Sequence, residues 1–354
     1  MSTQHYRIEF KKILENTILP EGISDEERNT RLLPLSMHIL KHMPKTLYRY
    51  RECSEMNFDA FNDDKLYAVT SDKFNDPYDC LFRYDKESLY HSMMTGMSKE
   101  AVYVLRNYFR KGGNFPDMLK MYCDQDLLDN ARKSIMNAND NMIEKYGQDT
   151  ANIKNEFTQY IYKKIEDAVQ TVKQMAFITC FSETIKSVTM WAHYANSHEG
   201  FALEYDPKIF QLKCQFCDNL QQCNKAASCN LYPVIYQQQR YDATNFLGWY
   251  IVKSMEQPIK NPDTFVTFRP LLYKSTQWSY EKEWRLIVSK INDFQDKTPA
   301  CIYGMRPKAI YYGSRISPIN KKLLHLIAKE KGIKEYQMYI DNKSYNYSIK
   351  YQKE

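Results

Sequence analysis

Short stretches of this chain alternate hydrophobic or aromatic side chains with polar ones, which is the pattern of a β-strand. The alternation is clear in residues 47–51, where tyrosine and arginine take turns, and it recurs at well-separated places. The predicted strands are residues 47–51, 65–70, 176–181, 200–205, 231–236, 283–288 and 309–312. Strands are therefore expected near both ends of the chain, with a long interval between the second and the third.

Longer stretches place hydrophobic side chains three and four positions apart, which predicts amphipathic helices. Two helices are expected before residue 45. Ser24 and Glu27 form a capping box at the start of the second helix, and Pro34 should kink or divide it. Further helices are predicted at residues 54–62, 245–255 and 320–331, and a series of them between residues 86 and 175.

Strands that bracket a group of helices are typical of an α+β fold. We therefore predict a mixed, largely antiparallel sheet core with a helical insertion. N-terminal helices in residues 1–45 should pack on a single α+β domain formed by residues 46–354. Within that domain, residues 86–175 form the helical insert and residues 212–230 a cysteine-rich insertion. The sequence has no Pro/Gly/Ser-rich linker and no internal repeat.

The composition indicates a chain that folds around its own hydrophobic core. It does not decide between nucleic-acid and small-molecule partners. With 354 residues, 43% of them hydrophobic, the chain can bury roughly three quarters of its unfolded surface. The net charge of +6 comes from 49 basic and 43 acidic residues spread along the chain, so it permits nucleic acid and equally suits an anionic dinucleotide. The start of the chain lacks a secretion signal, and no stretch approaches about 18 uncharged apolar residues, so we expect a cytoplasmic protein without membrane partners.

The first candidate for a chemical site is the segment 281–285. If the strand alternation includes it, Glu281, Glu283 and Arg285 share one face and Trp284 lies on the other. Adjacent carboxylates repel, so a fold that keeps them either uses them or neutralises them with Arg285 or another cation. Two interpretations stay open: a ligand site, or a solvated strand start in which Arg285 pairs with a neighbour.

Arg49 and Arg51 share one face of the first predicted strand. A planar guanidinium is suited to bind phosphate or carboxylate through two hydrogen bonds, so both are candidate ligand-binding residues. The alternative is that they pair within the protein, with Asp76, Asp79 or Glu283.

A proline-containing turn follows the second predicted strand. Pro77 biases Asp76 toward extended backbone, while Asn75 and Asp76 can cap nearby amides. The turn either lines a pocket with Asn75 and Asp76 or is purely structural.

A short helix is predicted to end near Asn196. Spacings of three and four place Trp191 and Tyr194 on one face, which should pack in the core, and His193 projects elsewhere. His193 is then either a proton carrier or a hydrogen-bonded structural histidine. All three residues are candidates for contact with a ligand.

Four of the nine cysteines lie within sixteen residues, at positions Cys214, Cys217, Cys223 and Cys229. Tetrahedral zinc takes four thiolate or imidazole ligands, and a Cys-x2-Cys pair is a usual first half of such a site. The second half departs from that pattern because its spacings are longer. A structural zinc is one interpretation, and free thiols or a redox pair is the other.

Several motifs occur in a fixed order between residues 46 and 316. They are Leu47-Tyr48-Arg49-Tyr50-Arg51, Phe74-Asn75-Asp76-Pro77-Tyr78-Asp79, Cys180-Phe181-Ser182, Met190-Trp191-Ala192-His193-Tyr194, Gly200-Phe201, Pro233-Val234-Ile235-Tyr236 and Trp278-Ser279-Tyr280-Glu281-Lys282-Glu283-Trp284-Arg285. Together they resemble the bacterial family catalogued as domain of unknown function 2971. That family name implies no activity, so the chemistry has to be argued from the residues.

A second pattern is similar to the Arg-Ser-Glu pattern of ADP-ribosyltransferases, with Arg49, Ser182, Glu281 and Glu283 at the matching positions. The resemblance implies that Arg49 holds the phosphates of NAD and that Ser182 supports the nicotinamide ribose. It gives Glu283 the catalytic role, because a carboxylate stabilises the positive charge that develops as nicotinamide leaves. The chain departs from that family in residues 181–184, where Phe-Ser-Glu-Thr replaces Ser-Thr-Ser, and in its long helical insert.

The preferred interpretation is an NAD-consuming enzyme of the ADP-ribosyltransferase type. It would act as an intracellular effector of the toxin or anti-phage kind, on a protein, nucleic-acid or small-molecule acceptor. One alternative is a metal-dependent nuclease or phosphodiesterase of a defence system, with Asp76, Asp79, Glu281 and Glu283 around a divalent ion. Another is a non-catalytic sensor that binds a nucleotide.

The sequence interpretation makes two further statements about the site. Arg49, Asn75, Tyr194 and Glu283 should approach one another around one cleft, because polar motifs within core-forming segments need a shared partner. Glu283→Gln should abolish activity on NAD and leave the fold intact, because it removes one of two adjacent like charges.

Overall fold

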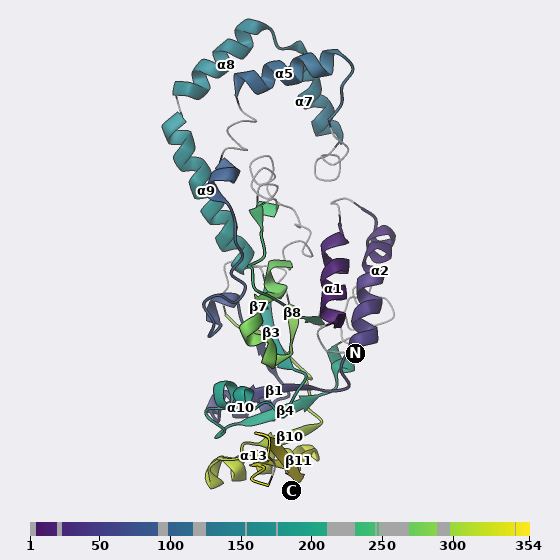
Figure 1. The fold of residues 1–354 in the computed structure, drawn as a ribbon, viewed down its shortest axis with the longest axis vertical. Coiled ribbons are helices and arrows are strands. Elements are labelled where there is room, and N and C mark those ends of the chain that lie inside the picture. Colours follow the sequence, from purple (N-terminus) through teal and green to yellow (C-terminus); the bar gives the residue numbers. More distant parts are fainter. Residues whose placement is uncertain are drawn as a thin grey trace.

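The computed structural model describes residues 5–19, 23–90, 98–115, 125–152, 154–174, 176–210, 231–244, 246–247, 269–288, 298–343 and 345–354. Figure 1 shows an elongated molecule with helices at one end and the sheets toward the other. The predicted cysteine-rich insertion, with Cys214, Cys217, Cys223 and Cys229, lies outside the described residues, as does most of the helix predicted at residues 245–255.

The prediction of an α+β fold with a largely antiparallel sheet and a helical insertion is confirmed. The α-helices of the described residues are α1 (His5–Asn16), α2 (Asp25–His42), α3 (Glu55–Asn62), α5 (Lys99–Arg110), α7 (Gln125–Asn137), α8 (Asp140–Asn152), α9 (Lys154–Gln174), α10 (Val188–Tyr194) and α13 (Pro318–Lys331). Short 3₁₀ helices are η1 (Ser71–Lys73), η2 (Pro207–Phe210), η3 (Arg269–Leu272) and η4 (Thr276–Glu281).

The strands form one large sheet and two small ones. They are β1 (Leu47–Arg51), β2 (Leu66–Ala68), β3 (Phe177–Ser182), β4 (Phe201–Tyr205), β5 (Leu231–Pro233), β6 (Ile235–Gln237), β7 (Tyr273–Ser275), β8 (Glu283–Val288), β9 (Ala300–Ile302), β10 (Ala309–Tyr312), β11 (Lys334–Ile340) and β12 (Ile349–Lys353). In the described residues the large sheet has the order β12-β11-β10-β4-β1-β3-β8-β5. Its pairs are antiparallel except β10 with β11.

The register places three motif strands side by side. Tyr48 of β1 lies opposite Ser182 of β3, and Ser182 lies opposite Glu283 of β8. Arg49 is therefore one residue away from a row that joins β1, β3 and β8. This register brings together segments that are more than a hundred residues apart in the sequence.

Two strand predictions need correction. The stretch 231–236 is divided into β5, at the edge of the large sheet, and β6, which pairs with β7 in a separate sheet. Pro233 explains the position of β5, because a residue without an N–H is tolerated at a sheet edge. Glu281 does not share the strand face of Glu283. It ends η4, and Lys282 follows with a left-handed backbone, φ 47°, before β8 begins.

The N-terminal helices α1 and α2 lie side by side and pack on the sheets (Figure 1). Phe10 and Leu14 of α1 and Leu35 and Ile39 of α2 are buried in the same cluster as Trp284 of β8. Hydrophobic burial of this kind, about 25 cal/mol per Å² of apolar surface, attaches the two helices to the domain.

The second N-terminal helix begins as its sequence predicts but is not divided. The Ser24 side chain accepts a hydrogen bond from the backbone N–H of Glu27 at 3.2 Å. Pro34 lies inside α2, which is one continuous helix from Asp25 to His42.

The helical insert extends away from the large sheet. In Figure 1, α5, α7 and α8 occupy the far end of the molecule and α9 runs back toward the sheets. Ile165, Ala168 and Val169 of α9 are buried against Phe82 and Leu89, in a cluster separate from the main core. The insert is therefore attached through α9 to residues outside the main core, and it does not interrupt the large sheet.

Candidate functional site

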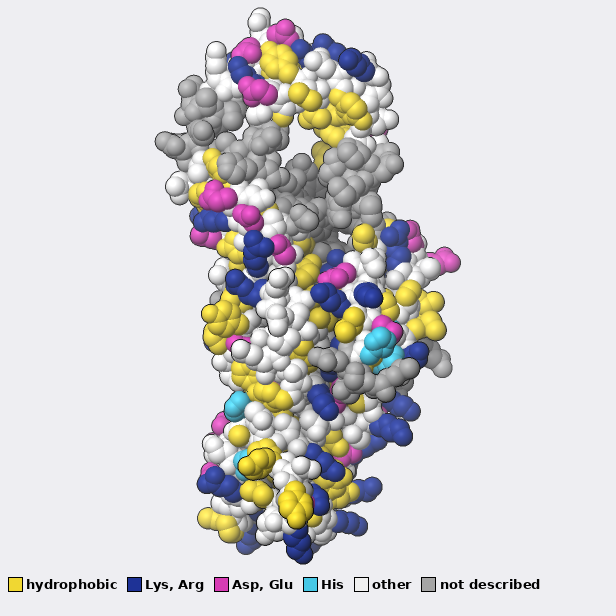
Figure 2. Space-filling view, in the orientation of Figure 1, with side chains coloured by type: hydrophobic (Ala, Val, Ile, Leu, Met, Phe, Trp, Pro, Cys, Tyr) yellow, Lys and Arg dark blue, Asp and Glu magenta, His cyan; other side chains and the backbone are white. Residues whose placement is uncertain are grey.

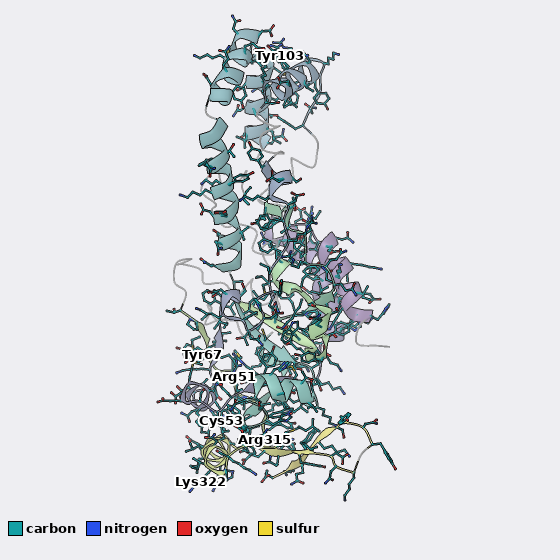
Figure 3. All side chains as sticks on the ribbon, turned by 60° about the vertical axis from the view of Figure 1, so that its left-hand side comes forward. Arg51, Cys53, Tyr67, Tyr103, Arg315 and Lys322 are labelled. Carbon is teal, nitrogen blue, oxygen red and sulfur yellow. The ribbon has the colours of Figure 1, made fainter. Side chains whose placement is uncertain are left out.

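A pocket of about 580 Å³ is lined by segments from across the chain. Its walls come from β1, α3, β2, the turn after η1, β3, α10, β7 and the start of β8. Figure 3 shows two lining residues, Arg51 and Tyr67, close together, whereas Tyr103 of α5 lies at the opposite end of the molecule. The lining side chains that can bind a polar ligand include Arg49, Arg51, Tyr67, Asn75, Asp79, Ser182, His193, Tyr194, Lys274, Glu281 and Glu283.

Arg49 is buried in the wall of this pocket, and most of its hydrogen-bonding capacity is unused. The residue is 7% exposed, and its Nη2 donates to the Tyr67 carbonyl at 2.8 Å. Nε and Nη1 are buried and have no hydrogen-bond partner among the described residues. A buried cation without a counter-ion costs free energy, so Arg49 is suited to bind an anion in the pocket.

A buried ion cluster lies at the same pocket. Lys274 Nζ lies 2.6 Å from Glu281, 3.1 Å from Glu283 and 3.1 Å from Asp79. Arg285 is fully buried and bonds Asp79 at 2.7 Å and Glu283 at 2.8 Å. Three carboxylates thus face two cations, and the charges balance when one carboxyl group is protonated.

The two glutamates differ in protonation. Burial and the charge of Glu283 raise the pKa of Glu281 to about 7, against the opposing effects of Lys274 and Tyr194. Burial also disfavours the charged form of Glu283, but Arg285 and Lys274 outweigh it and hold the pKa of Glu283 below its usual value. At neutral pH Glu283 is an ionised carboxylate, whereas Glu281 can exchange a proton.

Tyr194 connects Glu281 to the turn after η1. Its hydroxyl donates to Glu281 Oε1 at 2.6 Å and accepts from Asn75 Nδ2 at 3.4 Å. Burial raises the pKa of Tyr194, so the hydroxyl keeps its proton and remains a donor. His193, on the exposed side of α10, lies 2.9 Å from the Tyr280 hydroxyl through Nδ1. The four residues expected around one cleft, Arg49, Asn75, Tyr194 and Glu283, all line this pocket.

Ser182 supports the pocket from within its wall. The residue is 1% exposed, and its Oγ donates to the Glu281 carbonyl at 2.6 Å and accepts from the Thr184 N–H at 3.2 Å. These bonds fix the loop that presents Glu281. The hydroxyl is therefore a positioning group and has little capacity left for a ligand.

Three predicted site residues are not on the pocket surface. Asp76 accepts from the Tyr78 N–H at 2.9 Å and lines a different pocket of about 280 Å³. Trp191 is fully buried, with Nε1 donating to the Ile185 carbonyl at 2.8 Å. Arg285 lies beneath the pocket, in the ion cluster. The turn and the helix are thus structural at Asp76 and Trp191, while their neighbours Asn75 and Tyr194 reach the pocket.

Lys274 is the site residue that the sequence interpretation missed. It is 6% exposed and joins three carboxylates. Burial opposes its charge, but Glu283, Asp79 and Glu281 outweigh burial and raise the pKa of Lys274. A signal existed in residues 271–275, where this lysine is the charged residue of a short, mainly apolar and aromatic segment. The sequence analysis expected Arg285 or another cation to neutralise the two glutamates, and Lys274 in this segment was a candidate for that second cation.

Residues 190–286 match the family described as Protein of unknown function (DUF2971), which supports the family resemblance of the motifs within that range. The match includes Tyr194, Lys274, Glu281 and Glu283, whereas Arg49 and Asn75 lie outside it. No curated protein and no solved structure matches the chain. Among the helices that the structure describes, none combines the length and the apolar character needed to cross a bilayer.

Proposed function

We propose that this protein binds NAD in the pocket and transfers its ADP-ribosyl group to an acceptor. The observation on which the proposal rests is Arg49, a buried guanidinium at the pocket, two of whose nitrogens have no hydrogen-bond partner in the part of the chain that the structure describes. A diphosphate supplies the missing acceptor atoms, and guanidinium binds phosphate through two parallel hydrogen bonds. The volume of about 580 Å³ is within the range of small-molecule sites.

The strand order supports the Arg-Ser-Glu resemblance. Arg49, Ser182 and Glu283 come from three neighbouring strands, within one residue of a common cross-strand row. The three residues of the pattern therefore lie on adjacent strands of one sheet, and all three line the same pocket.

The proposed chemistry assigns the two glutamates different roles. The bond between C1′ of the ribose and the nicotinamide nitrogen breaks, and the electron pair leaves with nicotinamide. Glu283 is paired with Arg285 and Lys274, so NAD has to loosen part of this pairing before the ionised carboxylate can stabilise the positive charge that develops on the ribose. An acceptor hydroxyl or amine then attacks C1′ and loses its proton to Glu281, whose pKa of about 7 suits a general base.

Such an enzyme could consume NAD in the cytoplasm as an effector of the toxin or anti-phage kind, with a protein or nucleic acid as acceptor. The metal-dependent nuclease is less favoured, because Lys274 and Arg285 occupy the carboxylates that would bind the ion. Asp76, the fourth carboxylate of that alternative, lines the other pocket. A divalent ion would have to displace two buried cations.

The test is nicotinamide release from NAD by the full chain, with and without a chelator, in wild type and Arg49→Met. The variant keeps most of the side-chain volume and removes the guanidinium. We expect a loss of about 1.5–3 kcal/mol in NAD binding, or roughly a tenfold to hundredfold higher KM. Stability should be unchanged or higher, because the variant removes two unpartnered buried donors.

Arg315→Met is the matched control, since Arg315 is exposed and forms a 3.7 Å ion pair with Glu199 outside the pocket. It should change neither KM nor stability. Binding of NAD without turnover would show that the protein is a non-catalytic sensor and not a transferase. Activity that requires magnesium and a nucleic acid would instead support the metal-dependent nuclease. If Arg49→Met lowers stability and leaves KM unchanged, Arg49 is a structural residue.

A further inference from the structure

A second cluster of functional side chains lies between α1 and α2, away from the pocket. Glu9 of α1 and His38 and His42 of α2 offer ligand atoms that all lie within 4.8 Å of one another. His38 and His42 are four residues apart, so they share one face of α2. Figure 2 shows histidine side chains on the surface where α1 and α2 lie side by side.

The hydrogen bonding of His38 leaves one ring nitrogen available. Its Nε2 lies 2.8 Å from the Tyr6 carbonyl oxygen, which can only accept, so Nε2 carries the proton. The lone pair of the neutral ring is then on Nδ1. A backbone carbonyl that fixes the opposite nitrogen is the usual support of a histidine that binds a metal.

His42 has an unused nitrogen in a confined position. Its ring stacks on Tyr6 with centroids 5.3 Å apart, and its centroid is 4.6 Å from that of His38. Nε2 is buried and has no hydrogen-bond partner among the described residues. An unsatisfied buried nitrogen costs free energy, and a metal ion is a partner that would remove this cost.

A fourth donor lies on the same side of α1. His5 Nε2 is 3.1 Å from Glu9 Oε1, and the two residues are four apart. Two pairs of residues at a spacing of four, one pair on each of two packed helices, can surround one ion. The side chains would have to draw closer, because ligands of tetrahedral zinc lie about 3.4 Å apart.

We propose that Glu9, His38 and His42, with His5 as a fourth ligand, bind a zinc ion between α1 and α2. Imidazole nitrogen and carboxylate oxygen are ligands that zinc accepts in protein sites. The site is independent of the proposed NAD chemistry, and it differs from the cysteine cluster predicted from the sequence.

The zinc would fix α1 in its contact with the pocket wall. Arg7 of α1 donates to the carbonyls of Val234 at 2.5 Å and Glu283 at 3.0 Å, and it pairs with Glu183 at 2.7 Å. A metal that joins α1 to α2 would therefore stabilise α1, the helix whose Arg7 binds the backbone at the start of β8.

The experiment measures zinc per chain in the untagged full-length protein, after removal of metal and reloading with zinc. We expect Glu9→Gln/His42→Gln to bind about one zinc fewer than wild type. His325→Gln is the matched control, because His325 is an exposed histidine of α13 paired with Glu335 at 2.9 Å. Cys214→Ser/Cys217→Ser separates the two candidate sites and should retain the helix-bound ion.

A second measurement tests the proposal even if the double variant does not fold. Glu9→Gln alone changes a side chain that is 48% exposed, and it should weaken zinc binding by more than about tenfold. Zinc should raise the thermal midpoint of Cys214→Ser/Cys217→Ser more than that of the same protein carrying Glu9→Gln. The same zinc content in wild type, Glu9→Gln and the double variant would overturn the proposal. So would a loss of all zinc in the cysteine variant.

Discussion

At the residue scale, Glu281 makes the stability of the protein depend on pH. Its pKa is raised from 4.5 to about 7 by burial and by Glu283, so the folded state retains a proton that the unfolded state releases. Its stabilising contribution is therefore complete below about pH 4.5 and is lost as the pH rises through about 7.

We expect the free energy of unfolding of wild type, minus that of Glu281→Gln, to fall between pH 4.5 and pH 7 and to be constant above about pH 8. Urea denaturation at a series of pH values measures this difference. If Glu281 is the base, transfer to the acceptor also rises with a midpoint near pH 7 in wild type and loses this dependence in Glu281→Gln. A difference that grows with pH would contradict the assigned pKa.

The ion cluster changes what we expect of the Glu283→Gln variant. Removing one of two like charges was expected to leave the fold intact, but Glu283 is bonded to both Arg285 and Lys274 in the buried cluster. Glu283→Gln removes its bonds to both cations, and Asp79 with an ionised Glu281 then balances their charge, so the change should cost about 1.5–3 kcal/mol of stability.

Glu281→Gln is the matched comparison, and at pH 7 it should cost clearly less, because Glu281 is partly protonated there. Denaturant unfolding of both variants decides the point. Equal stabilities would mean that the ion cluster does not distinguish the two glutamates. Any loss of activity in Glu283→Gln has to be measured on the folded fraction.

At the scale of elements, the pocket depends on the close approach of β1 to the segment between α10 and β4. A Cβ atom on Gly200 would lie 2.1 Å from the Arg51 carbonyl oxygen and 3.1 Å from the backbone of Ala195. Gly200 also donates to the Ala195 carbonyl at 2.8 Å. The end of α10, which carries Tyr194, is held at this distance from β1 because residue 200 has no side chain.

We expect Gly200→Ala to destabilise the protein by about 1–3 kcal/mol, since the clash is with backbone and cannot be relieved by a rotamer change. Gly147→Ala in α8 is the control. Its nearest neighbours belong to the flexible side chain of Lys99, and alanine favours a helix, so the change should stay within about 1 kcal/mol of zero. Thermal unfolding of both variants tests the difference. Similar costs would show that the approach at Gly200 is not special.

At the scale of the whole molecule, the N-terminal helices are attached to the sheet by a polar contact as well as by their hydrophobic face. Arg7 is 5% exposed and bonds the carbonyls of Val234 and Glu283 and the side chain of Glu183. Trp284 Nε1 donates to the same Glu183 oxygen at 2.7 Å. The first helix and the start of β8 therefore share one part-buried carboxylate.

Arg7→Met should cost about 3–5 kcal/mol, because it removes a buried guanidinium and leaves the part-buried Glu183 without its cation. Arg31→Met on α2 is the control. Arg31 forms an exposed pair with Glu27 at 2.7 Å, so its loss should cost at most about 1 kcal/mol. Urea denaturation compares them. If the two variants are equally stable, α1 is held by hydrophobic packing alone.

Much of the fold was predictable because strand and helix patterns are local. The alternation in residues 47–51 and 283–288 and the capping box at Ser24 depend on neighbouring residues, and the structure has these elements where they were expected. The two strand predictions that needed correction also have local causes, but the sequence alone does not show how strongly these causes act. A left-handed Lys282 moves Glu281 off the strand, and Pro233 suits a sheet edge that only the strand order defines.

The sequence by itself determined many of the elements, the α+β class and the family match over residues 190–286, but strands β7, β9, β11 and β12 were not predicted from it. The tertiary structure decided which polar groups have partners. It left Arg49 without a counter-ion among the described residues, placed Lys274 among three carboxylates and gave Glu281 and Glu283 different pKa values. The physical reason is that burial and charge pairing are set by residues far apart in the chain, whereas periodicity and capping are set by residues a few positions away.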